Sequence, residues 1–406
     1  MSRRIISAID VGTTKVCTII GNVDSHGAIQ VLSVGIVPSH GMHKGIVVNP
    51  TQTARSIIES VRRAQDAAGV SIDSAYVGVT GRHITSTSTH GVVSIPRSDQ
   101  RVRPQDLRRV LTAAKRIQLA PERELLTVIP RQYLLDGQEG VTNPVGMHGF
   151  RLDAETLCIT AAAASVQNLV KCIRQTGIDI DDLILEPLAS AEAVLTPEEK
   201  SQGVILADIG GGTTDIAVLR NNTIAHIAVV PVAGYQCTSD ISIGLGLSFE
   251  VSEAMKKKYG SVVAVDKDKK QESNASITNG HSISYRDLCA IIRTRMEELF
   301  HLTLLEMPTA DYGALAPAGI VLTGGASKLP GLAELGAAVT HMPVRIGRPS
   351  GVYGIVDTLG DPAYATAVGL LLWGNKNQGK PTWQGKKPRS AAGRFLSLVR
   401  KLFTRY

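Results

Sequence analysis

The chain has few aromatic residues and few cysteines, and its N-terminus has no long apolar run. Aromatic residues make up 4% of the 406 residues. The five cysteines are odd in number and none belongs to a C-x-x-C pair, which predicts reduced core cysteines in place of a disulfide framework or a zinc site. The first residues lead straight into a strand-like stretch, without the apolar segment of a signal peptide. These absences predict a cytoplasmic protein.

Acidic residues are absent from the C-terminal tail. Positions 376–406 hold nine Lys and Arg and no Asp or Glu. Removing these nine from the 43 basic residues leaves 34 against 36 acidic ones, so the rest of the chain carries −2 although the whole carries +7. The basic character therefore belongs to the tail and not to the body of the protein.

Short Val- and Ile-rich runs alternate with helical patterns, which predicts an α/β fold. The length allows two or more domains, each with its own core. In the first part of the chain we expect strands at 5–11, 16–23, 29–37 and 75–79, with an amphipathic helix over 51–68.

The most informative stretch is 203–219, where two apolar runs flank a polar, glycine-rich corner. The corner contains Asp208, Gly210, Gly211, Gly212, Thr213, Thr214 and Asp215. Glycines without Cβ let backbone N–H groups approach phosphate oxygens, and we expect them to adopt the positive φ of a tight corner. Either carboxylate could lie near a phosphate-bound Mg²⁺, directly or through water. An ordinary β-hairpin is the alternative.

A second copy of this plan lies near the N-terminus. Residues 5–20 form strand, corner and strand, with Asp10, Gly12, Thr13, Thr14 and Lys15 at the corner. We read Lys15 as the replacement for the second acid and as a point charge for a phosphate. Two such hairpins in two halves of the chain predict two related lobes that face each other across one nucleotide.

Three further segments contribute candidate site residues. Glu186 opens a helix and could orient a water molecule for hydrolysis, although an acid at that position also simply suits the helix dipole. The strand 320–323 runs into Gly324, Gly325 and Ser327, a turn that lets a nucleoside lie against the backbone. A helix over 249–259 presents Glu253 and Lys256 on one face.

Two other regions depart from the lobe pattern. Residues 84–161 read as a small inserted α/β unit with a basic helix over 104–118, whose Arg108, Arg109, Lys115 and Arg116 form a solvated face or a partner surface. Residues 265–280 read as a polar loop, and 285–307 as a long amphipathic helix.

The tail reads as a linker over 376–393 and an amphipathic helix over 394–406. At 100° per residue its apolar side chains fall within one arc, while Arg400 and Lys401 lie outside it. The apolar members are Phe395, Leu396, Leu398, Val399, Leu402 and Phe403. Such a helix is too short to span a bilayer and is typical of one lying in the headgroup plane. A core-docked helix, a calmodulin-like target and a nucleic-acid tail are the alternatives.

This set of motifs resembles the actin/Hsp70/sugar-kinase ATPase superfamily, and within it the FtsA family of bacterial cell-division proteins. The resemblance covers residues 5–375 and rests on both hairpins and on Val77–Gly81, Glu186–Ser190, Thr238–Ile241, Glu253-x-x-Lys256 and Gly319–Gly325. One departure is Tyr235-Gln236, where such proteins more often have glycine and asparagine.

The resemblance implies an actin-like fold with two RNase H-like lobes around a cleft that binds ATP and Mg²⁺. Asp10 and Asp208 would lie near the metal, and Asp208 and Glu186 near the chemistry, while Glu253 and Lys256 would flank the adenine or ribose. The implied units are a first lobe (1–83, 162–190 and 346–375), an inserted subdomain (84–161), a second-lobe core (191–245 and 313–345) and its outer subdomain (246–312).

The resemblance also implies a role in cell division. Such a protein would self-assemble on the cytoplasmic face of the membrane at the septum and tether the FtsZ ring there, with at most slow ATPase activity and no nucleic-acid partner. Arg293 and Arg295 on the long helix are the candidate contacts for the FtsZ C-terminal tail, with solvated helix charges as the alternative, and the inserted subdomain would meet other division proteins. A pilus-assembly actin-like ATPase and a small-molecule kinase are the alternatives.

Overall fold

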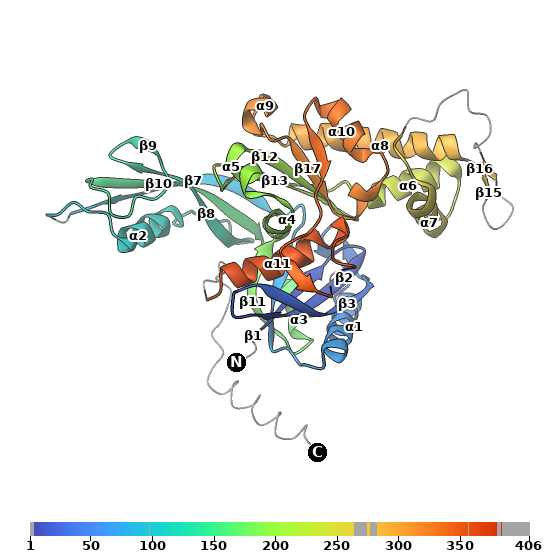
Figure 1. The fold of residues 1–406 in the computed structure, drawn as a ribbon, viewed down its shortest axis with the longest axis horizontal. Coiled ribbons are helices and arrows are strands. Elements are labelled where there is room, and N and C mark those ends of the chain that lie inside the picture. Colours follow the sequence, from blue (N-terminus) through green and yellow to red (C-terminus); the bar gives the residue numbers. More distant parts are fainter. Residues whose placement is uncertain are drawn as a thin grey trace, which may run out of the picture.

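The fold is described from a computed structural model, which places residues 4–96, 98–263, 274–276, 282–355, 357–379 and 383. The predicted amphipathic helix at 394–406 lies outside these residues, as does most of the predicted polar loop at 265–280. Three sheets of six, five and four strands dominate the described part of the chain, together with two short hairpins. Figure 1 shows two lobes stacked one above the other and a third unit projecting to the left.

The first lobe is built on the six-stranded sheet, in the order β11-β6-β1-β2-β3-β19. β1, β2 and β3 form an antiparallel meander, whereas β6 and β11 run parallel to β1. Its strands are β1 (Arg4–Val11), β2 (Lys15–Val23), β3 (Ile29–Pro38), β6 (Ser74–Val79), β11 (Asp179–Leu185) and β19 (Val352–Gly354). Its helices are α1 (Pro50–Ala68), α3 (Ala163–Arg174), α4 (Glu186–Val194) and α11 (Ala365–Lys376).

The second lobe repeats this plan on the five-stranded sheet, in the order β14-β13-β12-β17-β18. Its strands are β12 (Val204–Ile209), β13 (Thr214–Arg220), β14 (Thr223–Val230), β17 (Ile320–Thr323) and β18 (Val344–Ile346). Its helices are α6 (Gly234–Leu245), α7 (Phe249–Tyr259), α8 (Tyr285–Leu305) and α10 (Leu332–Thr340). The shared meander and parallel pair confirm the prediction that the two hairpins belong to two related lobes.

The strand registers align the two hairpins residue by residue. Asp10 pairs with Cys17 across β1 and β2, and Asp208 pairs with Asp215 across β12 and β13. Cys17 therefore occupies the position of Asp215. The expectation that Lys15 replaces the second acid is wrong, since Lys15 stands two residues earlier and corresponds to Thr213.

The inserted unit forms its own four-stranded sheet, in the order β7-β10-β8-β9, with α2 packed on one face. Its elements are β7 (Thr85–Ser94), α2 (Pro104–Ala114), β8 (Arg123–Leu135), β9 (Gln138–Val141) and β10 (Arg151–Ala162). The basic helix is shorter than predicted, because the chain turns away after Ala114 toward β8. The hydroxyl of Ser86 on β7 donates a hydrogen bond to the carbonyl of Ile227 on β14 (3.1 Å), so this unit touches the second lobe as well.

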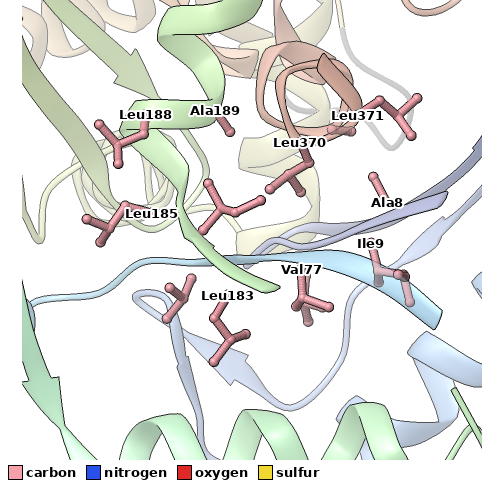
Figure 2. Close-up of a cluster of buried hydrophobic side chains, with 14 of the residues drawn as sticks. Ala8, Ile9, Val77, Leu183, Leu185, Leu188, Ala189, Leu370 and Leu371 are labelled. Carbon is pink, nitrogen blue, oxygen red and sulfur yellow. The ribbon is translucent and has the colours of Figure 1, made fainter. Parts of the chain in front are cut away.

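The connecting helices α4 and α11 pack on each other and on the first sheet. Figure 2 shows Leu188 and Ala189 of α4 and Leu370 and Leu371 of α11 facing side chains of β1, β6 and β11. All five cysteines are buried and none forms a disulfide, as predicted.

Short elements complete the described chain. They are β4 (Met42–His43), β5 (Ile46–Val47), α5 (Pro197–Gln202), β15 (Asn274–Ser276), β16 (Ser282–Ser284), α9 (Tyr312–Leu315) and two 3₁₀ turns, Gly325–Lys328 and Pro362–Tyr364. Trp383, within the predicted linker, is 4% exposed. Its backbone N–H donates to Asp182 Oδ1 (2.9 Å) and its indole Nε1 to Glu124 Oε1 (3.3 Å), which attaches the linker where the first lobe meets the inserted unit.

Candidate functional site

A small cavity of about 50 Å³ lies between the two lobes, where the two glycine-containing hairpins meet. Both hairpins line it, and so do residues from the ends of other elements. These residues are Asp10, Val11, Gly12, Thr13, Thr14, Lys15, Gly45, Thr80, Glu186, Asp208, Gly210, Gly211, Gly212, Thr213, Asp215, Gly324, Gly325, Ala363 and Thr366. The structure thus brings together nearly all of the residues predicted to bind the phosphates.

The three consecutive glycines serve close approach between the lobes. None of them has a positive φ, so the predicted left-handed corner is wrong. A Cβ on Gly211 would instead lie 2.3 Å from Thr14 Cγ2, and one on Gly212 would lie 2.6 Å from Thr13 Oγ1. Such distances are far below van der Waals contact, so any side chain here would push the hairpins apart.

Both acids of the second hairpin accept hydrogen bonds from hydroxyl groups of the first lobe. Asp208 Oδ2 accepts hydrogen bonds from Ser190 Oγ (2.6 Å) on α4 and from Thr366 Oγ1 (3.1 Å) on α11. Asp215 accepts one from Thr80 at the end of β6 and one from Thr213 (3.3 Å). These bonds fix the orientation of both carboxylates and tie the second lobe to the first.

Four carboxyl groups crowd the cavity with one cation among them. Burial raises the pKa of Asp10 to about 6 against the opposing effect of Lys15, whose Nζ lies 4.0 Å from Asp10 Oδ2. Burial raises the pKa of Asp215 to about 7, partly offset by the Thr80 hydrogen bond, and it raises that of Asp208 as well. The cavity therefore has an excess of negative charge that a bound cation would neutralise.

Glu186 is the first residue of α4, as predicted, and its side chain reaches the cavity. Burial raises its pKa well above the ordinary value, and the neighbouring Asp10, Asp215 and Asp208 raise it further. A protonated carboxyl group cannot accept a proton from water. A cation in the cavity would lower the pKa of Glu186 and favour the ionised form that a general base needs.

The acid cluster fits a magnesium ion by its chemistry. Carboxylate and hydroxyl oxygens are the ligands that Mg²⁺ prefers, and this ion usually keeps several of its own waters. Among the residues that the structure describes, no three His, Cys, Asp or Glu side chains converge closely enough to hold a metal ion by themselves. Asp10 and Asp208 therefore suit contact through water and phosphate better than a protein-only metal cage.

The predicted adenosine residues adjoin the second hairpin. Lys256 Nζ donates to the carbonyl of Gly234 (2.8 Å) and the hydroxyl of Thr238 (2.6 Å), and lies 2.6 Å from Glu253 Oε2. Burial alone would raise the pKa of Glu253. Lys256, together with hydrogen bonds from Thr238 and Lys257, instead lowers it to about 2 and keeps Glu253 ionised. The N–H of Gly234 in turn donates to the carbonyl of Gly210 (3.2 Å).

The second predicted nucleoside segment also reaches the cavity. Gly324 and Gly325 line it, and the buried Ser327 donates its hydroxyl to the carbonyl of Gly324 (2.7 Å). Among the residues predicted to bind the nucleotide, Gly324 alone has a positive φ, of 85°.

Sequence reasoning missed several residues that complete the site. Thr80 follows β6, and Thr366 belongs to α11, whose small-residue pattern gave no sign of a polar role. Gly45 lies in the β4–β5 turn, where its N–H meets Thr13 Oγ1 at 3.2 Å. In the same hairpin the His43 ring packs edge-on against Tyr235 (5.8 Å between centroids), and the Tyr235 ring packs at a tilt of 37° against Phe249 (4.8 Å). Tyr235, the noted departure from the family pattern, is therefore an interlobe contact.

The two arginines predicted for partner binding lie away from the cavity, on α8. Arg295 pairs with Asp240 through Nη2 (2.9 Å) and through Nε, and also with Glu298. Arg293 Nη1 donates to the carbonyl of Val262 (3.0 Å), and its Nε pairs with Glu297 (2.8 Å). Both guanidinium groups are partly exposed, and each already has protein partners.

The residues predicted to touch a membrane, 395, 396, 398–403, lie outside the described part of the chain. Within the described part, every helix is too short or too polar to cross a bilayer.

Two family models match the chain. "Cell division protein FtsA" matches residues 205–369, and "SHS2 domain inserted in FTSA" matches residues 81–160. Curated relatives named "Cell division protein FtsA" include that of Pseudomonas aeruginosa, 41% identical over 93% of this chain and 91% of the relative. The Neisseria meningitidis relative is 36% identical over 98% of both chains, and the Escherichia coli K12 relative is 35% identical over 92% of this chain and 91% of its own.

Solved structures share the fold at low sequence identity. The PilM–PilN type IV pilus biogenesis complex matches with a TM-score of 0.66 at 18% identity, over 91% of this chain and 98% of that one. MreB5 of Spiroplasma citri bound to ADP matches with a TM-score of 0.53 at 14% identity, over 93% and 99%. These matches confirm the predicted actin-like α/β fold.

Proposed function

Since the chain belongs to the FtsA family of cell division proteins, we propose that it binds Mg-ATP between its lobes, assembles on the inner face of the cell membrane at the division septum and tethers FtsZ there. The observation that carries this proposal is the pair of facing hairpins in an actin-like fold, together with relatives that align over nine-tenths of the chain. Membership of this family favours it over a pilus-assembly ATPase, whose solved relative is only 18% identical, and over a metabolic kinase.

The chain's own residues support nucleotide binding. Lys15 supplies a cation at the first hairpin, and residues of both hairpins line the same cavity. Asp10 and Asp208 suit a hydrated Mg²⁺, which would offset the negative charge described above. Gly324, Gly325 and the Glu253–Lys256 pair provide an adjoining surface for ribose and adenine.

In the proposed function, ATP hydrolysis is secondary to ATP binding. Glu186 at the start of α4 is the candidate for orienting an attacking water, and burial beside Asp10, Asp215 and Asp208 raises its pKa and so disfavours the ionised form that would act on the water. Hydrolysis would therefore be slow, and ATP would act chiefly by holding the two lobes in the conformation that assembles.

The sequence of residues 394–406 supports membrane attachment. One weakly bound helix per subunit becomes a stable attachment when subunits polymerise, because assembly raises the effective concentration of helices at the membrane. Sedimentation with phosphatidylglycerol-containing vesicles, with and without Mg-ATP, tests this. The full chain should co-sediment, and a chain ending at Gly393 should stay in the supernatant.

A matched pair of substitutions sharpens that experiment. Leu402→Glu places a charge within the apolar arc and should abolish co-sedimentation, whereas Thr404→Glu places it on the opposite face and should weaken binding only modestly. Equal loss in both variants would mean that net charge alone attracts the tail, and vesicle binding by the truncated chain would contradict the proposal.

FtsZ contact is proposed for α8, with Arg295 and Arg293 as the candidate residues. A carboxylate of the FtsZ tail would share guanidinium donors with Asp240 and Glu298. Arg295→Glu should therefore weaken binding of a labelled FtsZ C-terminal tail peptide, measured by anisotropy, while Arg286→Glu at the far end of the same helix should not. Unchanged affinity in Arg295→Glu would remove this residue from the contact.

A further inference from the structure

The inserted subdomain carries a groove that the nucleotide site and the tail do not use. It has a volume of about 390 Å³ and lies between α2 and the strand β7. Val92 and Val93 line it from the strand, Arg108, Arg109 and Thr112 line it from the helix, and Arg116 lines it from just beyond the helix end. Figure 1 shows α2 and β7 on the projecting unit at the left, away from the interlobe cavity.

The strand side of the groove is a sheet edge. β7 is the terminal strand of the four-stranded sheet and pairs with β10 alone. Its first half is partly covered, because Ser86 contacts β14. Its second half adjoins the groove, where the Val92 side chain is 49% exposed. An exposed strand edge offers backbone donors and acceptors to an added strand.

The helix runs antiparallel to the strand along the groove. At one end Arg109 Nη1 donates to the carbonyl of Ser94 (3.3 Å), and at the other Thr89 Oγ1 donates to the carbonyl of Ala114 (3.3 Å). Between them Gly91 allows close packing, since a Cβ there would lie 2.2 Å from the carbonyl oxygen of Val110. A chain laid along the edge of β7 would therefore also follow α2.

The helix side of the groove is positively charged. Arg108 and Arg116 are exposed, and neither forms an ion pair with any residue that the structure describes. Arg109 forms an ion pair with the buried Asp106 in the first turn of the helix (3.0 Å). Asp106 also accepts a hydrogen bond from the backbone N–H of Arg103 (2.9 Å). The groove thus offers two uncompensated guanidinium groups beside an open strand edge.

The spacing of these groups matches an extended chain. Arg116 lies two residues beyond the end of α2. Lys115 keeps a helical backbone there (φ −74°, ψ −12°) and donates its N–H to the carbonyl of Leu111, so the eight-residue separation from Arg108 still corresponds to about 12 Å. In an extended peptide, residues four apart point to the same side and are separated by about 13 Å. We propose that this groove binds an extended acidic segment of a partner protein, added as a strand to β7, with carboxylates four residues apart that pair with Arg108 and Arg116.

Other anionic partners fit the groove less well. No aromatic side chain lines it on which a nucleic-acid base could stack. A membrane surface would leave the strand edge unused. The inference rests on the proposed partner role of the inserted subdomain and names the chemistry of that partner, but it does not depend on ATP, FtsZ or the tail.

A designed peptide tests the proposal with the full chain. The probe is fluorescein-labelled Ser-Glu-Val-Thr-Val-Glu-Ser, whose glutamates are four residues apart, and binding is measured by anisotropy at low salt. The peptide with glutamine at both positions should bind at least ten-fold more weakly. The double variant Arg108→Glu, Arg116→Glu should lose binding to a similar degree, whereas Lys115→Glu, a neighbouring charge outside the groove, should keep it within about two-fold.

Two further readouts separate this mode from simple charge attraction. Bound peptide should slow amide hydrogen exchange at residues 90–94, and the double variant should instead bind the same peptide with lysines in place of glutamates. Equal binding by the glutamine peptide, or exchange unchanged at 90–94, would overturn the proposal. The proposal would also be overturned if the native chain did not bind the peptide while the double variant lost binding to phosphatidylglycerol vesicles. The peptide-binding and hydrogen-exchange results leave the vesicle test of the tail and the FtsZ-tail test unaffected.

Discussion

The hydroxyl of Thr80 in the first lobe donates a hydrogen bond to the carboxylate of Asp215 in the second lobe. Both side chains are buried, with exposed fractions of 6% and 4%. The two lobes are thus joined at the cavity itself by a bond to a group that a bound nucleotide and cation would face.

Replacing Thr80 by valine keeps its shape and removes this bond. Asp215 then retains only Thr213 as a hydroxyl donor, and we expect Thr80→Val to lower the free energy of unfolding by about 1–3 kcal/mol. Thermal melts of the nucleotide-free protein measure this, with Thr80→Ser as the control that keeps the hydroxyl. A Thr80→Val protein as stable as the native one would show that the bond contributes nothing to lobe closure.

Gly211 has no room for a side chain because Thr14 faces it from the other lobe. Gly211→Ala should lower both the melting temperature and the affinity for ATP, since its Cβ would lie 2.3 Å from Thr14 Cγ2. Thr14→Ser removes that methyl group and should restore part of both losses, with a coupling of about 1 kcal/mol. Gly360→Ala, which meets no atom within 4 Å, is the neutral control. Additive effects would mean that the hairpins do not touch in solution.

The acid cluster makes the nucleotide-free protein sensitive to pH. The pKa values of Asp10 and Asp215 rise to about 6 and about 7 in the folded protein, against 3.8 for an unperturbed Asp. Between these limits the folded state holds protons that the unfolded chain has released, so the free energy of unfolding falls as pH rises from about 4 to about 7. We expect a lower melting temperature at pH 8 than at pH 5.5.

An isosteric variant assigns that pH dependence to the cluster. Asp215→Asn should flatten the profile and melt above the native protein at pH 8, because it removes one buried charge. Glu59→Gln, on the surface of α1 beside Arg62 and Arg63, should not raise the melting temperature at pH 8. Should Asp215→Asn melt lower than native at both pH values, desolvation of this carboxylate would not limit stability.

Trp383 gives a spectroscopic signal for attachment of the linker. The chain has two tryptophans, so Trp373→Phe leaves Trp383 as the only indole. Its emission should resist acrylamide quenching several-fold better than free indole does. Glu124→Ala removes the Nε1 acceptor and should increase quenching, whereas Glu122→Ala should not. Quenching as fast as in an unfolded chain would show that the linker is not held there.

Local patterns predicted the elements of this fold well, and contacts between distant elements were the part that they could not supply. Both hairpins, the helix start at Glu186 and the helix at Phe249–Tyr259 follow from apolar periodicity and corner residues. The equivalence of Cys17 and Asp215 does not emerge when the two hairpins are compared by charge, because charge pairs Lys15 with Asp215. It emerges when each residue is placed by its distance from the first acid. Counting seven residues onward from Asp10 and from Asp208 would have found it.

Other errors arose because the determining contact lies far away in the sequence. Conformational freedom is the usual reason for three consecutive glycines, whereas here the reason is the opposing Thr13 and Thr14. Thr80 and Thr366 look like ordinary strand-end and helix residues until the second lobe is placed against them. Pro, Gly and Lys around Trp383 indicate a linker, and only its tertiary partners reveal the attachment.

The attachment of Trp383 limits how far the proposed membrane segment can stand from the body. Measured from the end of α11 at Lys376, the chain to Arg394 could reach about 60 Å when fully extended. Measured from Trp383, eleven residues reach about 40 Å at most. Trp383 lies beside β11 and β8, so the tether to the proposed membrane segment starts at the junction of the first lobe and the inserted subdomain. If residues 394–406 bind a membrane as proposed, this side of the subunit would face the bilayer, and subunits assembled in a row would share that orientation.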